Sequence, residues 1–176
     1  MHKTNFLELA EARRSVRAYK PDAVPEEMLQ AVLEAGRLAP SACNKQPWRF
    51  IVVRGEAVRR ALGAAYAREW FWKAPVVLAV CILPREAWTR SYDGKNYAMA
   101  DGALAMDHMM LAAAELGLGT CWIGAFDPAA AHEILGLPDG VEVLGMTPLG
   151  FPDVETAPRV RSRRPLGETV MKERWG

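Results

Sequence analysis

The strongest pattern along the chain is an unbroken apolar run at residues 76–83, VVLAVCIL, which follows Ala74-Pro75. A run of this length predicts a strand that is covered on both faces, and proline is tolerated at the entry of such a strand. Shorter apolar stretches predict further strands at Arg49–Val53, Gly119–Gly124 and Val141–Leu149.

Helical patterns fill the segments between these strands. Asn5 with Glu8 forms a capping-box pattern, and Asp127-Pro128 combines an N-cap residue with a first-turn proline. The expected helices span residues 5–14, 25–38, 56–70, 98–118 and 127–136. Because helices and buried strands alternate without hairpin signals, the sequence predicts an α/β or α+β fold around a central sheet.

The helix expected at residues 98–118 is apolar on nearly every side. A helix of this kind must be surrounded by protein, and in a short chain a second subunit is the simplest cover. Its polar residues Asp101, His108 and Glu115 are spaced seven apart. They suggest either a proton relay or metal site, or a satisfied buried network or subunit contact. The spacing favours the second interpretation, because ligands of one metal sit on adjacent turns.

Composition narrows the class of protein. The chain has 176 residues, of which 51% are apolar and 24% charged, with a net charge of +1. These values exclude disorder and predict a single domain over residues 1–176. The apolar runs are shorter than the roughly 20 residues of a membrane span, and the N-terminus lacks a signal-peptide core, so we expect a cytoplasmic protein without membrane contact. Three scattered cysteines predict neither a disulfide framework nor a metal-binding pair.

Arginines gather at two places, residues 13–17 and 159–164. Without these seven, 15 basic residues face 21 acidic ones. Two small clusters on an acidic body suit a single phosphate group better than nucleic acid, which usually meets a broad basic surface. The alternative, that both clusters are solvated tails, stays open on charge alone.

Common catalytic motifs are absent. The sequence contains no GxxxxGK[ST] loop, no GxSxG elbow and no HExxH pair. The closest approach to GxGxxG, at residues 117–122, ends in Trp122 and follows a helix, which disfavours a dinucleotide-binding fold. No side chain is assigned as catalytic, so a bound cofactor is expected to supply the chemistry of any enzyme.

Four segments together identify a family resemblance: RRSVR, PSACNKQPW, GLGTCWIG and RVRSRRPLGE, at residues 13–17, 40–48, 117–124 and 159–168. In this order and spacing, and with PLGFP at 148–152, they resemble the nitroreductase family of FMN-dependent flavoproteins. The resemblance implies an α+β fold with a central mixed sheet flanked by helices. It also implies an interlocked homodimer with one FMN in each of two interface sites.

The resemblance assigns cofactor-binding roles by position. The FMN phosphate and ribityl chain would meet Arg13, Arg14, Ser15, Arg17, Arg163 and Arg161. The loop laid against the flavin by the partner subunit would contain Pro40, Ser41, Ala42 and Asn44. The backbone beside the isoalloxazine would be that of Trp122, Ile123, Gly124 and Ala125. A purely local role remains open for Asn44, whose side chain is also suited to holding its own turn.

The chain departs from the family pattern at three positions. Cys43 and Ala125 stand where glycine is common, and His108 stands where an amide is common. The chain is also short, so a lid insertion is expected to be reduced. Six aromatic residues fall in the variable region that commonly shapes the substrate pocket in this family. The sequence supports equally a place in a lid over that pocket and a place in the hydrophobic core. They are Tyr66, Trp70, Phe71, Trp72, Trp88 and Tyr92.

The resemblance implies an oxidoreductase in which FMN takes a hydride from NADH or NADPH and reduces a nitroaromatic, quinone or similar acceptor by a ping-pong mechanism. Three alternatives stay open. The same fold could catalyse a specialised flavin reaction, such as reductive dehalogenation or substrate dehydrogenation. The protein could bind flavin without turnover. Nucleic-acid binding through the arginines would show a steep salt dependence and no flavin.

Overall fold

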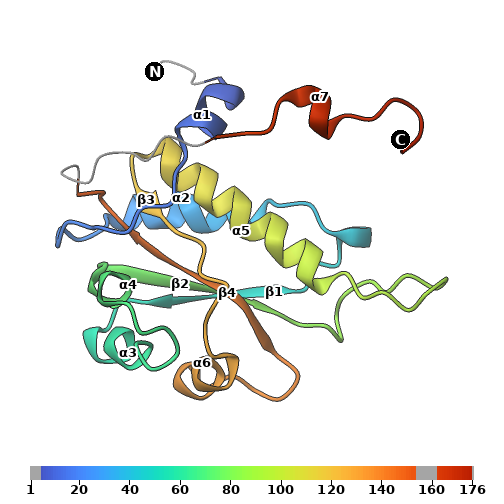
Figure 1. The fold of residues 1–176 in the computed structure, drawn as a ribbon. Coiled ribbons are helices and arrows are strands. Elements are labelled where there is room, and N and C mark those ends of the chain that lie inside the picture. The colour runs from blue at the N-terminus through green and yellow to red at the C-terminus, as the bar shows by residue number, and fades with distance from the viewer. Residues whose placement is uncertain (1–4, 154–161, 176) are drawn as a thin grey trace.

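The computed structural model describes residues 5–153 and 162–175, and is built around one four-stranded sheet (Figure 1). The strands are β1 (Trp48–Val53), β2 (Val76–Ile82), β3 (Gly119–Thr120) and β4 (Glu142–Gly150), in the order β1-β2-β4-β3. No helix within the described residues is long and apolar enough to cross a membrane.

The sheet differs from the expected mixed one, because all three strand pairings are antiparallel. Parallel pairing in the described residues is confined to an isolated bridge between Ser15 and Thr120. The helical connection between β1 and β2 starts and finishes at the same end of the sheet, where Val53 pairs with Val77. A helical connection has the same sequence pattern whether it crosses the sheet or returns beside its start, so the pattern alone left the direction undecided.

The helices surround this sheet. Their bounds are α1 (Phe6–Ala12), α2 (Glu26–Arg37), α3 (Glu56–Ala61), α4 (Glu69–Lys73), α5 (Ala98–Glu115), α6 (Pro128–Leu135) and α7 (Leu166–Thr169), with a 3₁₀ turn η1 at Ala42–Asn44. The capping box at Asn5 and the Asp127 cap are both formed as predicted. The single helix expected at 56–70 is instead α3 and α4, because the chain turns at Gly63, where a Cβ would lie 2.8 Å from the Arg60 carbonyl oxygen.

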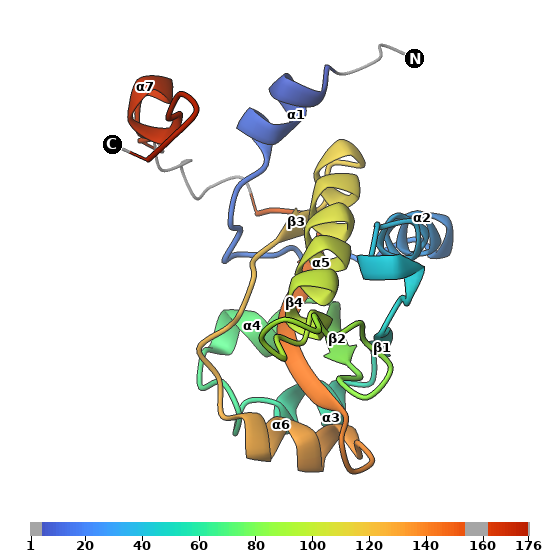
Figure 2. The ribbon, with the colours of Figure 1, turned by 90° about the vertical axis from the view of Figure 1, so that its right-hand side faces the viewer.

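Two helical layers cover the two faces of the sheet (Figures 1 and 2). Val76, Leu78 and Val80 of β2 pack with α2 and α5, whereas Val77 and Ala79 pack with α3, α4 and α6 on the opposite face. β2 is therefore buried on both faces, as its unbroken apolar run predicted.

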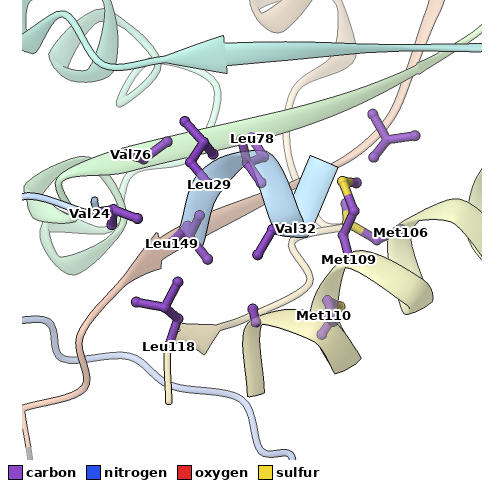
Figure 3. Packing of buried hydrophobic residues seen from close by; sticks show 12 residues of the cluster. Val24, Leu29, Val32, Val76, Leu78, Met106, Met109, Met110, Leu118 and Leu149 are labelled. Carbon is purple, nitrogen blue, oxygen red and sulfur yellow. The ribbon is translucent and has the colours of Figure 1, made fainter. Parts of the chain in front are cut away.

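Figure 3 shows the core between α2, α5 and the sheet, where side chains of all three pack together. This packing depends on close approach of the backbones. A Cβ at Gly36 of α2 would lie 2.7 Å from Cγ of Met109 on α5. A Cβ at Gly102 of α5 would lie 2.5 Å from Cγ2 of Ile82 on β2. Helix α5 is thus seated directly on the sheet, which gives the segments at its two ends a fixed base.

The aromatic residues of the variable region divide between core and surface. Phe71 is fully buried, and Tyr66 meets it edge-on at 5.4 Å between ring centroids. Trp70 and Trp72 pack against the same core cluster. Beyond β2, Trp88 packs on Tyr97, whereas Tyr92 is 96% exposed. The four aromatics at residues 66–72 therefore belong to the core, and Tyr92 lies outside it.

Candidate functional site

The arginine-rich segment after α1 lies against the edge strand β3 (Figure 1). The Val16 amide donates to the Thr120 carbonyl oxygen at 2.8 Å. A Cβ at Gly119 would lie 2.8 Å from Cβ of Val16, so glycine permits this approach. The segment is consequently fixed by its backbone and by buried Val16, which leaves the neighbouring polar side chains at the surface.

These polar side chains form a concentrated group of donors. Arg14, Ser15 and Arg17 are exposed and Arg13 is half-buried. None of the three arginines takes part in an ion pair of the described chain. Guanidinium groups and a hydroxyl without a carboxylate partner can bind a phosphate by charge-assisted hydrogen bonds.

Two residues that sequence reasoning missed hold this region together. Buried Thr147 accepts a hydrogen bond from the Cys121 amide at 3.0 Å and donates to the Pro148 carbonyl oxygen at 3.0 Å. The Tyr19 hydroxyl donates to the Val16 carbonyl oxygen at 2.6 Å. Burial, and secondarily Cys121, raise the pKa of Tyr19 well above its ordinary value, so it stays a neutral donor. No motif marks either residue; the one signal is that Thr147 is a polar residue inside an apolar strand.

The chain leaves the sheet after Thr120, so the strand expected at 119–124 is shorter than predicted. Ile123 is buried and exchanges backbone hydrogen bonds with Met146 at 2.8 and 3.1 Å. Gly124 and Ala125 then become exposed, and Trp122 is half-buried beside Gly145. An anchored residue followed by exposed backbone presents peptide groups at the surface, where a flat ligand can approach them closely.

The loop at residues 40–46 has an unusual backbone. Cys43, Asn44 and Gln46 all have positive φ, at 50°, 53° and 49°. Ser41 Oγ accepts from the Gln46 amide at 2.9 Å, and Asn44 Oδ1 accepts from Gln46 Nε2 at 3.0 Å. Asn44 thus helps to hold its own turn while its side chain stays exposed, together with that of Pro40. Ser41 and Ala42 are half-buried.

One chain does not bring these two regions together. The Ala42 amide meets Asp101 in the first turn of α5, whereas the arginine segment and β3 lie at the other end of that helix (Figures 1 and 2). An 18-residue helix is about 27 Å long. In the tail, Arg163 is exposed and donates to the Ser162 carbonyl oxygen at 3.4 Å. Arg161 lies outside the described residues.

Within the single chain the polar residues of α5 do not form a satisfied buried network, and the other expectation, a subunit contact, stays a prediction. Asp101 Oδ1 accepts the Ala42 amide at 2.9 Å, but Asp101 Oδ2 and His108 Nδ1 are buried without a hydrogen-bond partner in the described chain. Glu115 is exposed at the helix end. Within the described ranges no three His, Cys, Asp or Glu side chains gather in a way that would hold a metal ion.

Comparison with known proteins identifies the family. The model of the nitroreductase family matches residues 10–70 and 63–151 of this chain. The chain belongs to the nitroreductase family. It is a nitroreductase-family NAD(P)H oxidoreductase. The matched range contains three of the four segments that carried the resemblance, and the tail arginines lie beyond it.

Individual nitroreductase relatives agree over most of the chain. A Thermus thermophilus protein named NADH dehydrogenase is 33% identical, over 90% of this chain and 91% of its own. A Bacillus subtilis protein named FMN reductase [NAD(P)H] is 30% identical, over 84% of this chain and 66% of its own. The crystal structure of a nitroreductase family protein from Clostridium difficile is 35% identical, covers 98% of this chain and 100% of its own, and superposes with a TM-score of 0.88.

The three cysteines of this nitroreductase should differ sharply in reactivity. Burial raises the pKa of Cys81 to about 11 and also raises that of Cys121, whereas Cys43 is exposed. Because the thiolate is the reactive form, we expect a disulfide reagent at about pH 8 to label one thiol per native chain and three after denaturation. Cys43→Ser should abolish the native labelling. Rapid labelling of a second native thiol would contradict the burial of Cys81 and Cys121.

Proposed function

We propose that this nitroreductase binds FMN and passes electrons from NADH or NADPH to a small oxidised acceptor such as a nitroaromatic or quinone. The observation that carries the proposal is the group of three arginines without carboxylate partners, beside Ser15, on the segment that lies against β3. These three arginines and Ser15 together are suited to binding one terminal phosphate group. The exposed backbone of Gly124 and Ala125 continues from the same edge strand.

The donor set fits FMN in each of its parts. Arg13, Arg17 and Ser15 would hold the phosphate, with Arg14, Arg161 and Arg163 as further cations. Asn44 carries both a donor and an acceptor for the N–H and C=O edge of a flavin ring. When bound, FMN supplies the two-electron chemistry, accepting a hydride from the nicotinamide and delivering electrons to the acceptor. The chain's own residues bind and orient it, and no side chain is assigned a proton-transfer step.

The site is proposed to be completed by a second copy of the chain. Helix α5 has an exposed or half-exposed face that is mostly apolar, with one charged residue, Asp107, among Met99, Ala100, Ala103, Leu104 and Leu111. If two such helices pack antiparallel, the loop at one α5 N-terminus lies near the arginine segment at the other α5 C-terminus. This arrangement joins the two regions that one chain keeps at opposite ends of α5.

The C-terminal segment supports an interlocked form of this dimer. Every described residue from 162 to 175 is exposed, and α7 stands away from the sheet (Figures 1 and 2). Its apolar side chains Leu166, Val170, Met171 and Trp175 lie on the surface of the single chain. Apolar residues gathered on a projecting arm are typical of a segment that packs on a partner.

The experiment that tests the function is a flavin analysis followed by anaerobic mixing. The purified protein should be yellow and release FMN on denaturation. Stopped-flow mixing with NADH or NADPH should bleach the flavin without an acceptor, and double-reciprocal plots at several acceptor concentrations should be parallel. Release of FAD, or no flavin after reconstitution, would contradict the proposal. Bound FMN that no nicotinamide reduces would indicate a flavin carrier.

Arg13→Ala should weaken FMN binding by about ten- to a hundredfold, because a charge-assisted bond to phosphate contributes about 1.5–3 kcal/mol. Arg161→Ala should cost less, since Arg13 occupies the better-defined motif position. Arg68→Ala is a suitable control, as Arg68 is exposed and takes no part in an ion pair of the described chain. Fluorescence titration measures all three. Equal affinities for Arg13→Ala and the parent protein would refute the phosphate assignment.

A further inference from the structure

Asp101 is the one buried acidic residue in the described chain, at 2% exposure. Its Oδ1 accepts the Ala42 amide at 2.9 Å, while its Oδ2 is buried and has no partner among the described residues. It takes part in none of the ion pairs of that part of the chain. Burying a carboxyl group this deeply with a single hydrogen bond costs free energy, even in the first turn of a helix, where the helix dipole favours a negative charge.

This cost indicates that the Asp101 carboxyl group contributes little net stability to the fold. A leucine at this position would remove the buried carboxyl oxygens but leave the Ala42 amide without its acceptor, so the two effects on stability oppose each other. The one hydrogen bond of this carboxylate in the described structure is to the Ala42 amide, which lies 59 residues away in the sequence.

The bond holds a strained turn. Non-glycine residues in the left-handed region each cost about 1–3 kcal/mol and persist where the surroundings impose them. Cys43, Asn44 and Gln46 are three such residues within four positions. The Asn44 and Gln46 amides donate to the carbonyl oxygen and the hydroxyl of Ser41. These bonds shape the turn but do not place it on the protein.

Asp101 attaches the turn at residues 40–46 to helix α5. Among the described residues, its bond to Ala42 is the hydrogen bond that joins residues 40–46 to a distant element. The next residue in the helix is Gly102, whose backbone lies directly against Ile82 and Leu144 of the sheet. The sheet therefore fixes the position of α5, and the Asp101 carboxylate on α5 fixes the position of the turn that carries Asn44.

We propose that Asp101 is a positioning residue that sets the Asn44 turn for contact with the flavin ring in the second copy's site, an inference that rests on the FMN binding proposed above. It acts through the acceptor bond to Ala42, and an amide at the same position preserves that acceptor. The proposal therefore predicts different FMN affinities for two substitutions of Asp101. Asp101→Leu removes the acceptor, and Asp101→Asn keeps it.

The test compares these variants with Asp139→Asn, which neutralises an exposed aspartate in the turn before β4. Unfolding of the apoprotein, hydrogen exchange at the Ala42 amide and FMN affinity are measured for each. Asp101→Leu should unfold at close to the parent denaturant midpoint, exchange the Ala42 amide about tenfold faster and bind FMN about tenfold more weakly. Asp101→Asn should stay within about threefold of the parent in exchange and affinity, and Asp139→Asn should match the parent.

Two results would overturn the proposal: parental FMN affinity in Asp101→Leu, or an equal loss in Asp101→Asn and Asp101→Leu. An affinity loss that merely follows unfolding of Asp101→Leu would also overturn it, since the role would then be structural. Failure of the FMN assignment is distinguishable, because the parent protein itself would not bind the cofactor. In that case the exchange rates of the apoprotein still report whether Asp101 holds the turn.

Discussion

Leu104→Arg is expected to convert the protein into a monomer that no longer retains FMN. Leu104 lies in the middle of the apolar face of α5 and is 45% exposed in the single chain. In the proposed dimer an arginine there would put a bulky charged side chain into the contact at each of two symmetry-related positions, where desolvation costs several kcal/mol even with Asp107 one turn away. Because each flavin site is proposed to need the Asn44 turn of the second copy, loss of the dimer should also remove the cofactor.

Light scattering and the flavin content of the purified variant measure the two effects. Val58→Arg is the matched control, since Val58 is an apolar helical residue with 41% exposure on α3, on the opposite side of the sheet. It should stay dimeric and yellow. A dimeric Leu104→Arg protein would place the interface elsewhere, and a monomer with full FMN occupancy would show that one chain suffices for binding.

Gly102→Val should lower the free energy of unfolding by about 2–3 kcal/mol, through overpacking where α5 meets the sheet. Even a Cβ at this position would lie 2.5 Å from Ile82 Cγ2 and 2.9 Å from Leu144 Cδ2. The helix must therefore move off the sheet or displace both side chains. Chemical denaturation should show the loss as a lower midpoint with little change in slope.

Gly55→Ala separates this effect from a general effect of replacing glycine. Gly55 precedes α3 with an ordinary negative φ, and a Cβ there would meet nothing within 4 Å. Its substitution should change the free energy of unfolding by less than about 0.5 kcal/mol. Parental stability in Gly102→Val would mean that α5 is not held against Ile82 and Leu144 as the structure has it.

Local sequence patterns were sufficient to predict the elements in which a residue type has a single physical consequence. The apolar run of β2 required cover on both faces, and Val76 and Val77 now point into separate core clusters. Asn5 and Asp127 cap helices because their side chains accept free amides of a first turn. The single helix expected at 56–70 was wrong, because the chain turns at Gly63 between α3 and α4.

In the candidate site, too, some features could be predicted from the sequence and others could not. The order and spacing of four motifs were enough to identify the nitroreductase family and to nominate the arginine segment, since motif identity is written in the residues themselves. The antiparallel sheet, the separation of the two site regions by the length of α5 and the bond from Asp101 to Ala42 were decided only by the tertiary structure. Each of these depends on contacts between residues far apart in sequence, and such contacts leave no periodicity or spacing for a local pattern to reveal.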